Sequence, residues 1–351
     1  MKKERSSNIE LYRIVTMLLI VAHHYVVNSG LTAGKGVIYA HPLSKRSLFL
    51  LFFGAWGKVG INCFVLITGY FMCKSDITAK KFAKLLFEVL FYRLVINSIF
   101  WITGMEQFTR RGLLYTFLVV RSIGDGFTSA YLMFFLFIPF INILIKGMDE
   151  RKHLLLLALL GFMYVVLGTF SIFSVTMNYV SWFMVVYLIA AYIRLYPKKL
   201  WENRALWGSL TLLFMGLASA SIVLCMRKGV ETGTFRPYEY VADSNTFFAV
   251  AVAVCSFMFF RTLDIGRNKV INTIAASTFG VLLIHAHSDT MRKWLWKDVL
   301  DNVGHYGSRL MPLHAVGSVI GVFAVCTLID MVRIRLIEKP FFRLWDRVFG
   351  A

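Results

Sequence analysis

The sequence predicts an all-α membrane protein, a polytopic helical bundle with about ten transmembrane helices. Of its 351 residues, 58% are hydrophobic, and the mean hydropathy of +0.66 is too high for an ordinary globular surface. The apolar residues fall in blocks of about 17 to 25, the length at which an α-helix crosses a bilayer. A membrane β-barrel would show short alternating strands instead.

Charged or turn-forming residues separate the apolar blocks. In chain order we expect spans at about 10–28, 48–73, 82–104, 128–147, 153–172, 178–194, 205–226, 245–262, 270–289 and 311–336. The first follows the basic N-terminus and ends at Asn28. The other nine are bounded, in order, by Lys74, Lys81, Lys146, Lys152, Arg194, Arg204, Arg261, Lys269 and Arg333.

The second block is the least regular. An interfacial segment at 49–56, with the membrane helix starting near Gly57, is the alternative to one long helix. Small residues favour close helix packing in this block, namely Gly54, Gly57, Gly60 and Gly69. No internal repeat or linker interrupts the chain, so we expect a single integral membrane domain over 1–351.

The formal net charge of +19 does not indicate nucleic acid, because Lys and Arg are spread through the short connections between apolar blocks. With the N-terminus inside, 22 of the 38 basic residues lie on the inner side and 13 on the outer side, while Arg13, Lys58 and Arg93 lie within spans. This excess predicts a multi-pass plasma membrane protein with both termini in the cytoplasm.

Two further features follow from this orientation. Lys2, Lys3 and Arg5 resemble the start of a signal peptide, but Arg13 interrupts the apolar run and no small-x-small cleavage site follows. We therefore expect an uncleaved first helix. The outer segments 31–47, 106–128, 227–244 and 290–310 are expected as solvated loops, although polar and aromatic residues in them offer a hold for an outer substrate: Tyr238, Glu239, Tyr240 and Asp243.

The first span carries Arg13 and His24 on one face. Eleven residues at about 100° each bring the two side chains within roughly 20° of each other, about 16 Å apart along the axis. Ionisable groups inside an apolar span cost at least about 2.5 kcal/mol and indicate function. The alternatives are that Arg13 reaches the interface and pairs with Glu10, and that His24 is an interfacial residue without chemistry.

The five cysteines, an odd number inside or beside apolar blocks, imply no disulfide framework. Cys63 or Cys73 as a covalent acyl carrier is a weak alternative, because no basic residue nearby in the sequence activates either thiol. No His, Cys or Glu cluster has zinc-ligand spacing and no phosphate-binding glycine loop occurs. We therefore expect no metal and no cofactor.

Four segments resemble the membrane-bound acyltransferase-3 family. The first is the helix with the Arg13-to-His24 spacing. The others are Phe64-Val-Leu-Ile-Thr-Gly-Tyr-Phe71, with Thr68 where the family usually has Ser, Ser277-Thr-Phe-Gly-Val-Leu-Leu-Ile-His285, and Glu338-Lys-Pro340. Many members carry Arg-x-x-Arg at the cytoplasmic start of the third helix, where this chain has Lys81 and Lys84.

The resemblance implies an acyl-CoA-dependent membrane O-acyltransferase, in most members an O-acetyltransferase. Its acceptor would be a hydroxyl of a cell-surface or exported polysaccharide or of a lipid-linked sugar. The partners are then acyl-CoA, the glycan acceptor and the lipid bilayer, with no nucleic acid. His24 is the expected base, since an imidazole with an ordinary pKa of about 6.5 suits that role at neutral pH.

The resemblance, together with depth and charge, implies the remaining site residues. His285 lies about as deep in its span as His24, so the two are expected to share a catalytic site; donation from His285 to a helix backbone is the alternative. Arg13, Lys81 and Lys84 are expected to bind the acyl-CoA phosphates. Buried or structural charges are expected at Glu10, Lys58, Arg93 and Glu338. The alternative function is a transporter or flippase for an anionic or glycan solute, with Arg13, Lys58 and Arg93 along its path.

Overall fold

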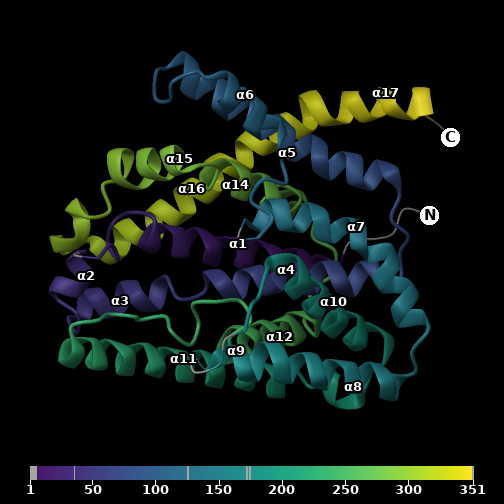
Figure 1. The fold of residues 1–351 in the computed structure, drawn as a ribbon, viewed down its shortest axis with the longest axis horizontal. Helices are drawn as coiled ribbons and strands as arrows, with labels where there is room; N and C mark the ends of the chain where they lie inside the picture. The colour runs from purple at the N-terminus through teal and green to yellow at the C-terminus, as the bar shows by residue number, and fades with distance from the viewer. Residues whose placement is uncertain (1–5, 35, 125, 171–172, 174, 350–351) are drawn as a thin grey trace.

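A computed structural model describes residues 6–349 except 35, 125, 171–172 and 174. Lys2, Lys3 and Arg5 lie outside the described residues. The described chain is mostly helical and contains no strand (Figure 1). The predicted all-α class is therefore confirmed.

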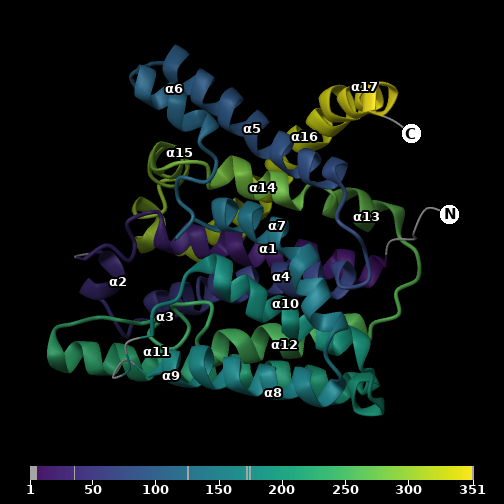
Figure 2. The same ribbon diagram turned by 45° about the vertical axis from the view of Figure 1, so that its right-hand side comes forward.

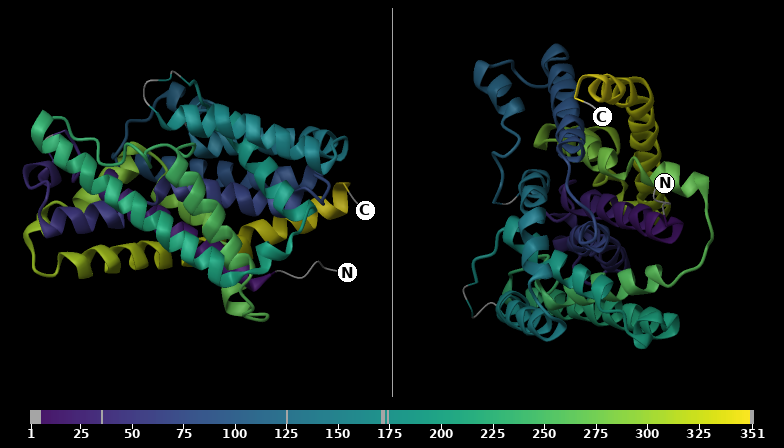
Figure 3. Two further views of the ribbon diagram at one scale, coloured as in Figure 1. Left: turned by 90° about the horizontal axis from the view of Figure 1, so that it is seen from below. Right: turned by 90° about the vertical axis from the view of Figure 1, so that its right-hand side faces the viewer.

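Helix α1 (Ser7–Val27) lies in the middle of the bundle. It packs against α4 (Gly57–Met72), α12 (Phe247–Arg261), α14 (Thr278–His285) and α16 (Met311–Arg333). Figures 1 and 3 show α1 enclosed, with α5 and α17 on one side of it and α8 and α11 on the other. The residues on the α1 surface thus face protein on several sides, which is where a polar site can be kept away from lipid.

The other helices complete the layers around this centre (Figure 2). In chain order they are α2 (Val37–Ala40), α3 (Lys45–Phe53), α5 (Ala79–Ile102), α6 (Arg110–Phe117), α7 (Phe127–Lys146), α8 (Glu150–Leu160), α9 (Leu167–Thr169), α10 (Tyr179–Leu195), α11 (Arg204–Thr232), α13 (Lys269–Ala275), α15 (Asp289–Lys293) and α17 (Lys339–Phe349). Short π- or 3₁₀-helical turns extend them: η1 (Gly161–Val166), η2 (Lys199–Glu202), η3 (Trp294–Val299), η4 (Gly304–Gly307) and η5 (Ile334–Glu338).

Every predicted span has a helical counterpart. In the described part of the chain, seven helices are long and apolar enough to cross a membrane: Ser7–Val27, Lys45–Met72, Ala79–Ile102, Phe127–Lys146, Glu150–Thr169, Arg204–Thr232 and Met311–Phe349. A pair bent by 95°, Lys269–His285 with Asp289–Gly307, qualifies as an eighth. The remaining two predicted spans correspond to shorter apolar helices, Tyr179–Leu195 and Phe247–Arg261.

The second predicted span is broken between α3 and α4, at residues 54–56. The close packing predicted from its glycines is confirmed. A Cβ atom at Gly57 would lie 2.2 Å from the ring of His23, and Cβ atoms at Gly54, Gly60 and Gly69 would lie 2.6 to 2.8 Å from atoms of α1 or α10. Only glycine allows this approach, so the broken helix holds α1 in place.

The outer segment 290–310 differs from the expectation of a solvated loop. It folds into α15, η3 and η4, with Ser288 capping α15 by accepting a hydrogen bond from the backbone N–H of Met291. The ring of Trp296 is fully buried, 6.4 Å from the ring of His285. The predicted span 270–289 correspondingly ends at His285. The charged residues of segment 290–310 make it look like a loop in the sequence, because only one face of its short helices packs inward.

Candidate active site

Two histidine rings from different helices meet in the half of α1 remote from its first residue. His24 lies in the last turn of α1 and His285 ends α14. Nδ1 of His24 is 2.9 Å from Nε2 of His285, and the ring centroids are 5.1 Å apart. His285 is fully buried and His24 is half-buried. The two side chains therefore form one site, as their similar predicted depths implied.

The hydrogen bonds determine which nitrogen of each ring carries the proton. Nδ1 of His285 lies 2.6 Å from the carbonyl oxygen of Val281, which can only accept, so His285 donates there. Its Nε2 is then a bare acceptor in the neutral ring. His24 must donate to it from Nδ1, and Nε2 of His24 is left unprotonated.

His23 has a different environment from its neighbour. Its Nδ1 donates a 2.6 Å hydrogen bond to the carbonyl oxygen of Gly54, in the turn between α3 and α4. Its ring is also pressed against Gly57. His23 thus packs against the broken helix, while His24 faces α14.

Two cations lie within electrostatic range of His24, namely Lys58 and Arg292. Lys58 in α4 donates a 2.6 Å hydrogen bond to the hydroxyl of Tyr179. Arg292 in α15 pairs with Asp289 at 2.9 Å. The sequence indicated Lys58 as a buried charge or as part of a transport path, and it gave no reason to select Arg292, because the bend before α15 has no sequence signature.

Arg13 lies near the opposite end of α1 and faces polar groups. Its guanidinium is 3.8 Å from the carboxylate of Glu10, which supports the pair considered as an alternative. However, Nε of Arg13 is buried and has no hydrogen-bond partner in the described chain. Tyr131 of α7 lies within its electrostatic range and shares a 2.8 Å hydrogen bond with Thr68 of α4. Glu10 therefore leaves part of the hydrogen-bonding capacity of Arg13 unused.

The other predicted basic residues make separate contacts. Lys81 is exposed, and its Nζ lies 2.8 Å from the hydroxyl of Ser75. Lys84 pairs with Glu338 at 2.6 Å. Arg93 donates to the backbone carbonyl of Tyr115 at 2.5 Å and so holds the segment that includes α6. Arg93 thus has a structural contact, while Lys81 also donates to the backbone carbonyl of Asp76 and stays exposed at the start of α5.

A buried ionic cluster joins α5 to the end of α16. Arg333 pairs with Asp330 at 2.8 Å, Glu338 at 2.6 Å and Glu88 at 3.1 Å. Tyr92 adds a 2.7 Å hydrogen bond to Asp330. Arg333 and Asp330 are almost wholly buried, so each needs the other's charge. Of these residues the sequence selected only Glu338, because the partners come from distant parts of the chain.

No group of three or more His, Cys, Asp or Glu side chains in the described residues is arranged to hold a metal ion. In the described part of the chain, no disulfide joins any of the five cysteines. Cys63 is buried and receives a 2.8 Å hydrogen bond from the hydroxyl of Tyr12, among α1, α4 and α12.

The comparisons with known proteins show the family of the chain. A family model described as an acyltransferase domain, of the acyltransferase-3 type, matches residues 6–331. No curated protein and no solved structure matches the chain. The matched range contains both histidines and Arg13.

Proposed function

Because the chain belongs to the acyltransferase-3 family and is a multi-pass membrane acyltransferase, we propose that it transfers an acyl group from cytoplasmic acyl-CoA to a glycan hydroxyl. The acyl group is acetyl, and the acceptor is an exported or cell-surface polysaccharide or its lipid-linked precursor. The enzyme lies in the plasma membrane with both termini in the cytoplasm, in keeping with the distribution of basic residues.

The observation that supports this proposal best is the unprotonated Nε2 of His24. A base must offer a lone pair, and the chain of hydrogen bonds from Val281 through His285 fixes His24 in the tautomer that does so. His24 is also half-buried, so its ring is reachable, whereas His285 is enclosed. His24 therefore acts on substrate and His285 positions it.

The reaction follows from this assignment. Nε2 of His24 takes the proton of the acceptor hydroxyl, and the oxygen attacks the thioester carbonyl. The carbon–sulfur bond then breaks, and the imidazolium returns its proton to the CoA thiolate. Lys58 and Arg292 supply positive charge where the carbonyl oxygen becomes negative.

The donor binds along the other half of α1. CoA carries phosphate groups and a long pantetheine arm, so cations near the cytoplasmic surface fix one end while the thioester reaches inward. Arg13 and Lys81 supply these cations. Lys84 contributes less, because Glu338 already neutralises it. About 16 Å of helix between Arg13 and His24 accommodates the arm.

Proteoliposomes of defined orientation test the proposal. Acetyl-CoA added on the side of the N-terminus should acetylate glycan enclosed on the other side, with CoA thiol appearing only where the donor was added. If transfer required both substrates on one side of the membrane, the placement of Arg13 near the cytoplasmic surface and of His24 near the outer side would be contradicted. Absence of any CoA release would favour the transporter or flippase, which moves solutes without cleaving a thioester.

A second measurement separates direct transfer from an acyl-histidine intermediate, since both use Nε2 of His24. Radiolabel from the acetyl group that stays on the protein without acceptor, and is lost in His24→Ala, would indicate the covalent route. No retained label in the wild type would indicate direct transfer.

A further inference from the structure

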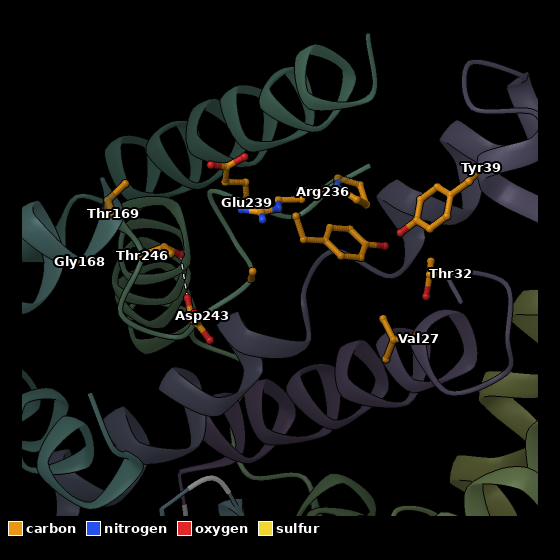
Figure 4. Close-up of a pocket in the computed structure, with 12 residues that line it drawn as sticks. Val27, Thr32, Tyr39, Gly168, Thr169, Arg236, Glu239, Asp243 and Thr246 are labelled. Carbon is orange, nitrogen blue, oxygen red and sulfur yellow. Dashed lines mark hydrogen bonds between the residues drawn. The ribbon is translucent and has the colours of Figure 1, made fainter. Parts of the chain in front are cut away.

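A cavity next to the histidine pair has no part in the steps above. Its volume of about 450 Å³ falls within the range of about 300–1,000 Å³ typical of small-molecule sites. Its walls come from the end of α1 at Val27, from α2, from α9 and from the connection between α11 and α12 (Figure 4). Because Val27 is three residues beyond His24, the cavity opens about one helical turn further out.

The polar groups of the cavity are available to a ligand. In the described chain, no hydrogen bond or ion pair engages the side chains of Tyr39, Arg236, Glu239 or Asp243. Figure 4 shows Arg236 and Glu239 between Tyr39 at one end and Asp243 at the other. One cation against two carboxylates gives the lining a net charge of −1, with hydrogen-bond donors and acceptors side by side.

Two fixed aromatic rings complete the lining. Tyr39 is stacked on Phe235 with centroids 5.0 Å apart, and Tyr238 donates a 3.0 Å hydrogen bond to the carbonyl of Leu51. Burial raises the pKa of both phenols, so they stay neutral. Aromatic faces beside carboxylates and a guanidinium match a sugar ring, which offers an apolar C–H face and a rim of hydroxyls.

Contacts between aromatic rings relate the cavity to the reacting histidine. The centroid of Tyr238 lies 6.2 Å from that of His23, which lies 5.8 Å from that of His24. The centroid of Tyr238 therefore lies at most 12.0 Å from that of His24, a separation that a polymer of a few sugars spans.

We propose that this cavity is a glycan subsite that binds a neutral saccharide unit next to the unit that is acylated. The proposal rests on the proposed function, since it assigns part of the acceptor. The net negative lining disfavours uronic acids and phosphorylated sugars. Binding of a non-reacting unit here contributes to holding the reacting hydroxyl at His24.

The test compares the wild type with the double variant Glu239→Gln/Asp243→Asn. The probe is unacylated surface glycan purified from cells that lack the gene, used intact and after mild acid cleavage to single sugars. For intact glycan we expect the variant to show a KM at least tenfold higher, with kcat and the KM for acetyl-CoA unchanged. Single sugars should give equal KM values with both proteins. An unchanged KM for intact glycan, or tighter binding by the variant, would overturn the subsite.

Two additional measurements keep this result separate from the proposed function. The matched control Glu231→Gln/Asp298→Asn changes exposed outer carboxylates away from the cavity and should behave as wild type. Equilibrium dialysis of radiolabelled intact glycan without acyl-CoA measures binding alone. If the wild type binds glycan and the double variant does not, while the wild type transfers no acyl group, the result would support the subsite and contradict the proposed function. Wild-type protein that binds no glycan would overturn the subsite, whatever the transfer assay gives.

Discussion

Replacement of His285 by leucine tests the hydrogen-bond chain directly. The change keeps His24 but removes the acceptor of its Nδ1–H. An inward-facing donor left without a partner costs about 1–3 kcal/mol, and the ring is then free to take the other tautomer or turn away. We therefore expect kcat to fall roughly 5- to 150-fold. His24→Ala removes the base itself and should cost more, about 10² to 10⁴-fold.

The assay is release of CoA thiol from acetyl-CoA in the presence of acceptor glycan, with purified protein in proteoliposomes. His285→Gln serves as the conservative variant, because the amide oxygen of glutamine can accept the hydrogen bond from Nδ1–H of His24. This variant should regain most of the rate that His285→Leu loses. His41→Leu is the matched control, since His41 is exposed and its ring stacks on Tyr306, outside the hydrogen-bonded pair. Thermal unfolding measured in parallel identifies any misfolded variant.

Wild-type kcat in a folded His285→Leu protein would refute the positioning role. Equal losses in His285→Leu and His285→Gln, with unchanged thermal stability, would show that the acceptor atom opposite His24 is irrelevant. His23→Ala should lose far less activity than His24→Ala, because the ring of His23 is turned towards Gly54. The opposite ranking would reassign the base.

Three further changes test the donor site and the packing. Arg13→Ala should weaken acyl-CoA binding by about 1.5–3 kcal/mol in an equilibrium titration, and Lys81→Ala by less; wild-type affinity in Arg13→Ala would leave Arg13 a purely structural role. Gly57→Ala puts a Cβ atom 2.2 Å from the ring of His23, so we expect a loss of about 1–3 kcal/mol of stability, measured as a lower Tm; an unchanged Tm would mean that the contact relaxes freely. Arg333→Met leaves buried Asp330 and Glu88 without their cation and should destabilise the protein by about 3–5 kcal/mol; equal or higher Tm would show that these carboxylates are protonated or solvated.

The spans were predictable because the bilayer imposes a length that apolar blocks reveal directly. The break between α3 and α4 was visible as an alternative, since Gly54 and Gly57 fall where helices approach most closely. The helical segment that follows His285 was not visible. Its helices are short and carry charged residues, among them Arg292 and Lys293, so neither length nor composition separates them from a loop.

The sequence predicts those site residues that share one helix or lie at the same depth in the membrane. The periodicity of α1 placed Arg13 and His24 on a common face, and counting residues placed His285 at the level of His24. The contacts between Lys58 and Tyr179 and between Thr68 and Tyr131 depend on how separate helices rotate against each other. A single sequence does not contain that rotation. The catalytic and donor-binding roles of these residues stay predictions until the variants are measured.

The ionic cluster around Arg333 bears on where the domain ends. The family match stops at residue 331, yet the charge that neutralises buried Asp330 comes from Arg333, which is itself held by Glu338. A fragment trimmed to the matched range would keep the carboxylate and discard its counter-ion. The matched range is thus shorter than the electrostatically complete unit, and we expect a fragment that ends at residue 331 to be less stable than one that extends through Glu338.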